Sequence, residues 1–379
     1  MLDYEVLRVI WWVLVGVLLI GFAVTDGFDM GVGALLPVIG KNDTERRVII
    51  NTVAPHWDGN QVWLITAGGA IFAAWPTVYA TAFSGFYVAM VLTLMALFFR
   101  PVGFDYRSKI EDPRWRTTWD WCLFIGGAVP PIVFGVAFGN LLQGVPFSLD
   151  QYLRSSYEGN FFGLLNPFGL LAGFVSLFMI VTQGATWLMM KTEGDVLARA
   201  RNVASITGLL TAILFAAAGY WVANGIDGYV ITAFQGVDAV SNPLQKSVVV
   251  EAGAWLQNYE SYPWMMVAPV LGVVMALFTA LFARFGKGAL AFTTSSLSIA
   301  GIILTAGFSM FPFIMPSSLN PAQSLTVWDA TSSQNTLSVM LVAAVIFVPI
   351  ILAYTLWTYY KMFGRVNKQF IEANKHSVY

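Results

Sequence analysis

Two acidic side chains, Asp26 and Asp29, lie inside the first long apolar stretch of this 379-residue sequence. An ionisable group at membrane depth costs about 3 kcal/mol or more unless a partner or water compensates it, so such groups usually serve ion or proton chemistry. Three residues apart on a helix, the two carboxyl groups share one face. A helix that enters the apolar region near Val9 reaches Asp29 after about 30 Å, which predicts that both acids lie in the inner third of a membrane.

A structural role for these two acids is the alternative. They can be boundary residues that are wetted from the cytoplasm and paired with a basic loop. The apolar residues that continue beyond them, as far as Leu36, favour the functional interpretation. Gly27, Gly31 and Gly33 thin the same stretch and predict that another helix backbone approaches closely there.

A second polar group, HWDGNQ at 56–61, opens the next apolar stretch. Asp58 can cap the N-terminus of a helix, which stabilises a helix by about 1 kcal/mol. A carboxylate, two amides and the imidazole of His56 in one short run also suit a hydrated entry for protons or ions. The two roles are compatible, and the sequence does not choose between them.

The third polar group, at 100–109, contains Arg100, Asp105 and Lys109. A solvated basic loop is the expected structure for it. Asp29, Asp58 and Asp105 are all predicted at the same membrane boundary, so their geometry allows a shared hydrated path. Carboxyl groups close to one another can hold a proton that neither would retain alone.

The elements that must position these groups are membrane helices. Hydrophobic residues make up 57% of the chain and charged residues 11%, whereas a soluble domain has about 25% charged residues. These values predict a single, all-α polytopic membrane domain over residues 1–379. The net charge of -1 and the lack of a basic tract give no indication of a nucleic-acid partner. Runs long enough to cross an apolar core of about 30 Å predict about nine transmembrane helices, at 9–36, 57–75, 79–99, 119–140, 164–189, 203–222, 264–283, 289–312 and 337–360.

The basic residues predict the orientation. All of the 20 Lys and Arg residues except Arg8, Arg154 and Lys246 fall in alternate connections or in the C-terminal tail. The positive-inside rule then places the N-terminus outside and the C-terminus in the cytoplasm. The weakly apolar 57–75 run must cross because the connections on either side are both basic. Long outer segments follow, in which 247–256 is expected as packed loop or, alternatively, as a short surface helix.

The sequence offers few groups for redox or hydrolytic chemistry. Its two histidines, His56 and His376, fall outside the predicted crossings, and membrane haems take axial His, Met or Cys ligands. Cys122 has no disulfide partner and no metal-ligand spacing. There is no P-loop, CxxC or HExxH motif. We therefore expect a chain that ligates no metal or cofactor and that is not an enzyme on its own.

Several segments spread over the whole chain closely resemble subunit II of the cytochrome bd quinol oxidases, the bacterial terminal oxidases. They are TDGFDMGVG at 25–33, PHWDGNQVW at 55–63, FRPVGFDYRSK at 99–109, GNLLQG at 139–144, NPFG at 166–169, MFPFIMPSS at 310–318 and WDATSS at 328–333. The sequence looks like an enterobacterial member, with the second of the two bd isoenzymes of such bacteria as one candidate. No local feature distinguishes the two isoenzymes.

The resemblance implies an inner-membrane complex that oxidises ubiquinol or menaquinol at the periplasmic side and reduces dioxygen to water. It would generate membrane potential without pumping, because protons for water formation come from the cytoplasm. Subunit I would hold two b-type haems and one d-type haem, which agrees with the shortage of histidine here. Subunit II would be its nine-helix partner, with a structural quinone in some members and a small single-helix accessory subunit alongside.

The resemblance also implies a role in cytoplasmic proton delivery for Asp29, Asp58, Asp105 and Lys109. The secondary candidates are Asp26, His56, Arg100 and Tyr379. Two other functions remain open from the residues themselves. Acids beside glycines and an interrupted helix are also found in ion- or proton-coupled secondary transporters, although those bind their ion near the midplane. In a purely structural membrane subunit, Asp29 and Asp58 would only cap or pair.

Overall fold

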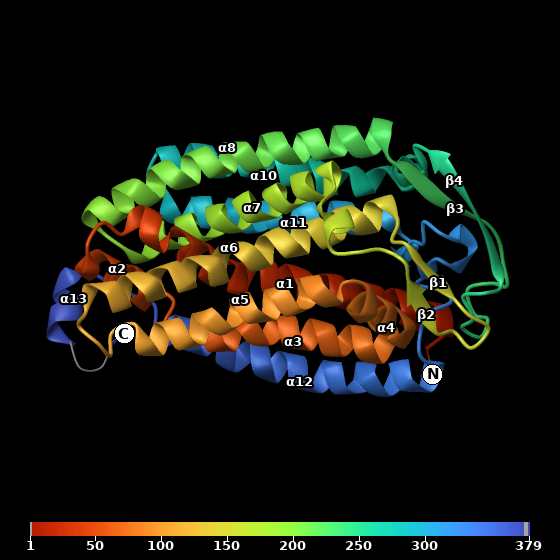
Figure 1. Cartoon of the computed structure of the whole chain (residues 1–379), viewed down its shortest axis with the longest axis horizontal. Helices are drawn as coiled ribbons and strands as arrows, with labels where there is room; N and C mark the ends of the chain where they lie inside the picture. Colours follow the sequence, from red (N-terminus) through yellow and green to blue (C-terminus); the bar gives the residue numbers. More distant parts are fainter. Residues whose placement is uncertain (1, 375–377) are drawn as a thin grey trace.

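The computed structural model describes residues 2–374 and 378–379 and shows long helices that run along one axis (Figure 1). Among the described residues, eight helices are long and apolar enough to cross a membrane. They are α1 (Tyr4–Ile39), α5 (Tyr87–Tyr106), α6 (Pro113–Gln143), α7 (Pro167–Lys191), α8 (Gly194–Gly225), α10 (Val267–Arg284, preceded by the 3-10 turn η3, Pro263–Met266), α11 (Gly288–Met310) and α12 (Gln334–Lys361). The chain is therefore an all-α polytopic membrane protein.

The expected second crossing corresponds to α3 (Trp57–Ala74), which packs along α1 in the same bundle. It is not among the eight because its first turns carry Asp58, Asn60 and Gln61, which leave it without a sufficiently long apolar stretch. The expected third crossing, at 79–99, is wrong in its bounds. The chain breaks at Phe86 into α4 (Pro76–Gly85) and α5, and a Cβ atom on Gly85 would lie 2.8 Å from the ring of Tyr157.

The solvated loop predicted at 100–118 is largely helical. Helix α5 continues to Tyr106, and α6 already begins at Pro113, where the Asp112 side chain accepts a hydrogen bond from the backbone N–H of Arg114 at 2.7 Å. Arg100 therefore lies inside a helix and is 1% exposed. The same helix leaves Asp105 exposed, so the two residues have opposite environments.

The two ends of the bundle differ in structure (Figure 1). One end holds the basic connections, the short helices α2 (Asp43–Asn51) and α13 (Lys368–Ala373), and the C-terminus. The opposite end holds three two-stranded antiparallel sheets. These are β1 (Phe147–Leu149) with β2 (Ser155–Tyr157), β3 (Asp227–Phe234) with β4 (Lys246–Ala252), and β5 (Phe313–Met315) with β6 (Leu325–Thr326); the short helices α9 (Gln257–Ser261), η1 (Phe162–Leu165), η2 (Ala254–Leu256) and η4 (Pro321–Gln323) lie beside them.

Both expectations for 247–256 were incomplete. Its first part is strand β4, in which three consecutive valines, Val248 to Val250, pair with β3. Branched side chains favour the extended backbone over a surface helix. The buried Arg8 on α1 holds this hairpin by donating hydrogen bonds to the backbone carbonyls of Val237 and Ala239.

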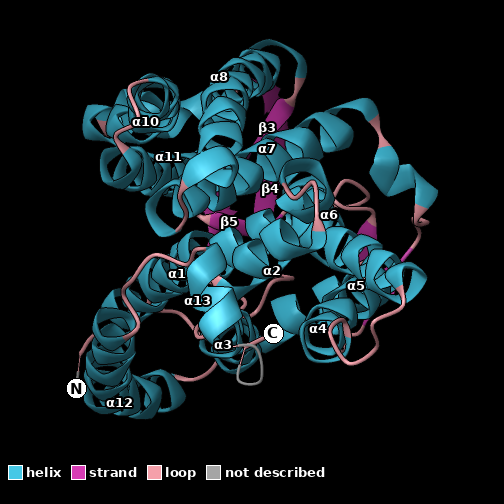
Figure 2. Cartoon of the chain, turned by 90° about the vertical axis from the view of Figure 1, so that its left-hand side faces the viewer, coloured by secondary structure: helices cyan, strands magenta, loops and turns pink. Residues whose placement is uncertain are grey.

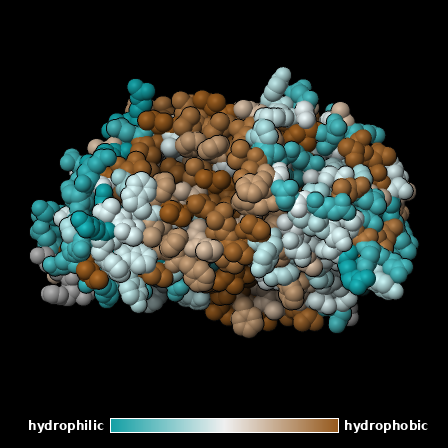
Figure 3. All heavy atoms as spheres, in the orientation of Figure 1, coloured by the Kyte–Doolittle hydropathy of each residue, from teal (hydrophilic) through white to brown (hydrophobic). Residues whose placement is uncertain are grey.

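On the face shown in Figure 3, an apolar belt crosses the middle of the bundle between two more polar ends. Such a belt, at right angles to the helix axes, is the surface that a membrane-spanning bundle presents to lipid. Seen from one end, α7 lies between α8, α10 and α11 on one side and α1, α3, α5 and α6 on the other (Figure 2). We call α7, α8, α10 and α11 the second group of helices and α1, α3, α5 and α6 the first group. Helix α12 stands at the edge beside α1, and Leu337 is its one buried residue.

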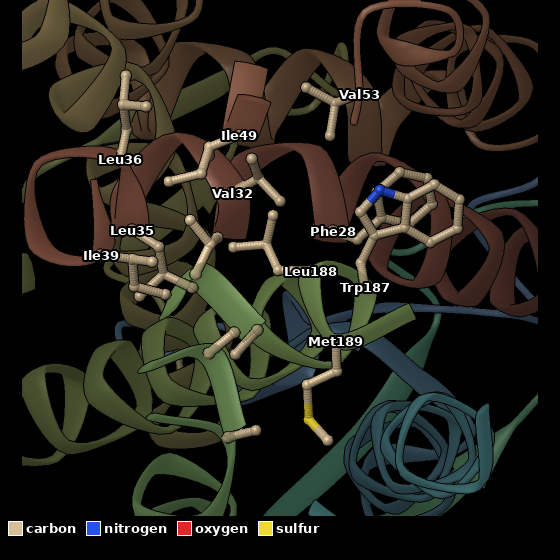
Figure 4. Close-up of a cluster of buried hydrophobic side chains, with 14 of the residues drawn as sticks. Phe28, Val32, Leu35, Leu36, Ile39, Ile49, Val53, Trp187, Leu188 and Met189 are labelled. Atoms are coloured by element: carbon tan, nitrogen blue, oxygen red, sulfur yellow. The ribbon is translucent and has the colours of Figure 1, made fainter. Parts of the chain in front are cut away.

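The predicted close approach at the α1 glycines is confirmed. A Cβ atom on Gly31 would lie 2.9 Å from the Cα atom of Gly184 on α7, so the two backbones touch. Beside this crossing, Phe28 stacks on Trp187 with ring centroids 4.0 Å apart. The surrounding cluster of apolar side chains, drawn in Figure 4, joins α1, α2 and α7 at the end of the bundle that holds the basic connections.

Candidate functional site

The first acid of α1, Asp26, forms a fully buried ion pair with Arg100 on α5. The two guanidinium nitrogens Nη1 and Nη2 donate to its two carboxylate oxygens at 2.9 and 2.5 Å. A Cβ atom on Gly126 of α6 would lie 3.0 Å from Cγ of Arg100, so this glycine leaves room for the arginine. The bidentate ion pair uses both carboxylate oxygens of Asp26 and fixes their position.

The second acid, Asp29, has a different environment. Its side chain is 0% exposed, and its Oδ2 accepts a hydrogen bond from Nδ2 of Asn60 at 2.8 Å. Its Oδ1 is buried and has no hydrogen-bond partner among the described residues. The boundary interpretation, in which both acids are wetted and paired with a basic loop, is therefore wrong. Burial by other helices excludes solvent from both carboxyl groups, and the partner of Asp26 is itself helical and buried.

Asn60 connects Asp29 to the C-terminal end of α12. The hydroxyl group of Tyr359 donates to Oδ1 of Asn60 at 2.5 Å. The ring of His56 stacks on the ring of Tyr359 at a centroid distance of 4.3 Å, and its Nε2 atom has no partner among the described residues. Burial, together with the positive charge of Lys191, lowers the pKa of His56 to about 4. The imidazole is consequently neutral near pH 7.

The predicted cap by Asp58 is wrong. His56 occupies the cap position of α3 and makes no side-chain capping hydrogen bond, while Asp58 is exposed in the first turn. Asp105 and Lys109 are exposed as well. These three side chains therefore lie at the surface of the chain, separate from the buried Asp29.

Tyr379 brings the surface groups together. Its ring lies 6.2 Å from that of Phe104, and its hydroxyl group interacts with Asp105 and Trp57. Burial and the negative charge of Asp105 raise the pKa of Tyr379. On α2, Nε of Arg47 and Nδ2 of Asn51 donate to its backbone oxygen at 3.1 and 2.9 Å.

The structure thus forms two subsites at one end of the bundle. The surface subsite contains Asp58, Asp105 and Tyr379, and the buried subsite contains Asp29 and Asn60. Asp58 and Asn60 belong to the same first turn of α3, which links the subsites along the chain. His376 lies outside the described residues.

Basic residues beside the surface subsite form an ion-pair network. Arg107 and Arg46 both bind Asp120, at 2.5 and 2.7 Å, and Arg107 and Arg116 both bind Asp43, at 3.0 and 2.8 Å. The network ties α2 to α6 and to the end of α5. Arg107 and Asp120 are buried, so these positive charges also fix the structure around the site.

Sequence reasoning missed Tyr359 and the specific role of Asn60. Asn60 belongs to the polar run at 56–61. Its position two residues after Asp58 was the only sequence feature that could have drawn attention to it. Tyr359 lies 299 positions further along the chain, and nothing in its local sequence indicates that it contacts Asn60. Within residues 2–374 and 378–379, no three His, Cys, Asp or Glu side chains are grouped to hold a metal ion.

Comparisons with known proteins show what this chain resembles. A family described as cytochrome bd terminal oxidase subunit II matches residues 7–362. The cytochrome bd-I ubiquinol oxidase subunit 2 of Escherichia coli K12 is 66% identical over the full length of both chains. A probable cytochrome oxidase subunit 2 of Haemophilus influenzae is 60% identical, also over both full lengths.

More distant relatives also align over nearly the whole length of both chains. The cytochrome bd ubiquinol oxidase subunit 2 of Bacillus subtilis is 34% identical, covering 94% of this chain and 96% of its own. A chain in the solved structure of the bd oxidase from Geobacillus thermodenitrificans superposes with a TM-score of 0.65, covering 95% of this chain and 99% of that one. At 12% identity, this last similarity shows the fold alone.

Proposed function

We propose, from the premise that this chain belongs to the family of cytochrome bd terminal oxidase subunit II, that it carries protons from the cytoplasm toward the redox cofactors of its partner. The chain is a subunit of a quinol oxidase of the bacterial inner membrane, and its partner in the complex is subunit I. Reduction of dioxygen to water consumes protons, which must reach a buried site. The two subsites at one end of this chain suit such a delivery.

The contrast between Asp26 and Asp29 supports the proposal most directly. A group that relays protons must change its charge during turnover. Both oxygens of Asp26 are occupied by Arg100, which opposes protonation. Asp29 has no cation paired to it in the described chain and keeps one oxygen without a hydrogen bond, so it can gain and lose a proton with little rearrangement.

The surface subsite is suited to collect protons. Asp58, Asp105 and Lys109 are exposed at the end of the bundle that the positive-inside rule assigns to the cytoplasm. Tyr379 remains protonated at neutral pH because its pKa is raised, so its hydroxyl group can donate a hydrogen bond to Asp105. We assign the entry to this surface subsite and the inner station to Asp29.

The proposal extends to the rest of the complex. Subunit I would hold two b-type haems and one d-type haem, and ubiquinol or menaquinol would supply the electrons. A single-helix accessory subunit and a structural quinone complete the proposed assembly. The apolar belt in Figure 3 is the surface available to membrane lipid and to subunit I.

The test is oxygen uptake by the purified complex carrying Asp29→Asn or Asp58→Asn, with haem content measured on the same samples. An amide keeps the shape and the hydrogen bonds but cannot carry the proton. We expect uptake to fall by about tenfold or more in each variant. Asp195→Asn, an exposed acid at the start of α8, is the matched control and should leave uptake unchanged.

Normal turnover in both variants with full haem content would contradict proton delivery. A parallel loss of haem and uptake would instead favour a structural role for these acids. The transporter interpretation has less support, because Asp26 and Asp29 lie in the C-terminal half of α1 rather than at its middle.

A further inference from the structure

We propose that Asn60 and Tyr359 are positioning residues that make Oδ1 of Asp29 the oxygen at which the proton is taken up and released. This inference rests on the proposed function of Asp29 in proton delivery. Its basis is the direction of two hydrogen bonds, from Tyr359 to Asn60 and from Asn60 to Asp29.

The first step concerns the amide of Asn60. A tyrosine hydroxyl group has a single proton, and that of Tyr359 points to Oδ1 of Asn60. Nδ2 of Asn60 must then face the opposite way, toward Oδ2 of Asp29. The reverse amide orientation would place Oδ1 of Asn60 against an ionised carboxylate, with two acceptors facing each other. Tyr359 therefore fixes the amide as a donor to Asp29.

The second step concerns the carboxyl group. Oδ2 already accepts the N–H group of Asn60 on one of its two lone pairs, whereas both lone pairs of Oδ1 are unused. The proton is therefore held at Oδ1, which has no hydrogen-bond partner in the described chain. On uptake, a protonated group of the entry path loses its proton to Oδ1, where the new O–H bond forms, and keeps the electron pair of the broken bond. On release, the O–H bond at Oδ1 breaks and the proton moves on, while Asn60 and Tyr359 keep their own hydrogens.

The third step concerns what holds Tyr359. Its ring stacks on His56 at 4.3 Å and meets the edges of Phe28 and Trp187 at 6.4 and 6.3 Å. Asn60 is 1% exposed. These aromatic contacts do not involve the hydroxyl group, so Tyr359→Phe removes the hydrogen bond and retains the packing.

The decisive variant is Tyr359→Phe in the assembled complex. Tyr354→Phe, on an exposed position of the same helix, is the matched control. We expect haem content to be unchanged and oxygen uptake to fall by about threefold to tenfold in Tyr359→Phe. The alkaline limit of uptake should move to higher pH, because a carboxyl group that has lost a hydrogen-bond donor keeps its proton longer.

Infrared spectroscopy distinguishes positioning from packing, because the carboxyl band of Asp29 would not shift if Tyr359 served packing alone. The carboxyl C=O band of Asp29 is identified by its loss in Asp29→Asn, and it should shift in Tyr359→Phe and not in Tyr354→Phe. Asn60→Asp is the second variant, in which two carboxyl groups share a proton and the band should change again.

An unshifted Asp29 band together with an unchanged pH profile in Tyr359→Phe would overturn the positioning role. In that case, impaired uptake in Asp29→Asn would show that proton delivery itself stands. Normal uptake in Asp29→Asn would instead contradict the proposed function, whatever the behaviour of Tyr359→Phe.

Discussion

The two helical groups of this chain bury different kinds of polar side chain. The first group, α1, α3, α5 and α6, encloses Asp26, Asp29, Asn60 and Arg100. The second group, α7, α8, α10 and α11, encloses mainly hydroxyl groups, among them Thr182, Thr207, Thr211, Thr279, Thr294, Ser295 and Ser298, together with Gln183 and Lys191 on α7. The first group therefore buries the two acids of α1, whereas most of the buried polar side chains of the second group are hydroxyl groups.

Several hydroxyl groups in the second group donate hydrogen bonds to backbone carbonyls of their own helix. Thr182, Thr207 and Thr279 each donate to the backbone carbonyl four residues earlier, so they change no charge. Pairs such as Thr279 with Thr294 then join neighbouring helices at 2.9 Å. In membranes such interhelical hydrogen bonds contribute about 0.6 kcal/mol each. Helix α7 contacts both groups, through α1 and α6 on one side and α8 and α11 on the other.

The largest effect is expected at the buried ion pair. Arg100→Met leaves the charge of Asp26 uncompensated and should destabilise the fold by about 3 to 5 kcal/mol. The amount of haem-containing complex that survives solubilisation and heating measures this loss.

The double variant Arg100→Met with Asp26→Leu is the control for the ion pair. It removes both charges, so much of the lost complex should return. If the Arg100→Met complex is as heat-resistant as the unmodified one, the ion pair between Arg100 and Asp26 does not stabilise the first group of helices.

A substitution at the crossing of α1 and α7 tests how closely the two groups of helices pack against each other. Gly31→Ala places a methyl group 2.9 Å from the Cα atom of Gly184. The contact is with the backbone of α7, so no flexible side chain can move aside to relieve it. We expect a loss of about 1 to 3 kcal/mol, seen as a lower midpoint of thermal unfolding.

Gly219→Ala on α8 is the control for the crossing, because a Cβ atom there meets nothing within 4 Å. It should leave the midpoint unchanged or raise it slightly, since alanine favours a helix. Equal effects of the two substitutions would contradict a close crossing.

A pH effect is expected from His56 in the first group. Its pKa is about 4 in the folded chain and about 6.5 when unfolded. Between these values the unfolded chain binds a proton that the folded chain does not, so stability is complete above about pH 6.5 and falls as the pH drops toward 4.

Thermal unfolding between pH 7 and pH 4 measures the contribution of His56. The variant His56→Gln should lose less stability on acidification than the unmodified chain, because glutamine does not titrate. An identical acid dependence in both would show that His56 does not stay neutral in the fold.

The smallest effect is expected at the hydroxyl groups of the second group. Thr279→Val removes the hydrogen bond to Thr294 and keeps the side-chain shape, which should cost about 0.6 kcal/mol. Oxygen uptake should be unchanged at every pH. A shift of the pH profile would show that the second group takes part in proton transfer and would remove the contrast.

Much of the architecture could be predicted because it follows from hydropathy and charge. The long helices and the close approach at Gly31 depend on local sequence, and the placement of the basic connections at one end follows from the positive-inside rule. The partner of Asp26 could not be predicted in the same way. Arg100 is 74 positions away, and its basic neighbours indicated a loop rather than the last turns of a helix.

The remaining differences also have physical causes. Phe86 interrupts an apolar run that hydropathy alone treats as continuous, and the paired strand β4 depends on a partner, β3, that periodicity does not reveal. Tyr359 contacts Asn60 through the packing of α12, which is decided by tertiary structure. Local sequence therefore indicated which acids lie within a helix, while their different hydrogen-bond partners depend on tertiary structure.

The peripheral position of α12 has a consequence for biosynthesis. The ribosome makes this helix after every other spanning helix of the chain, and the chain inserts into the membrane in the same order. Asp29 is consequently enclosed early, while the aromatic residue that orients its amide neighbour arrives last. Until α12 docks, a nascent chain therefore lacks the hydrogen bond from Tyr359 to Asn60.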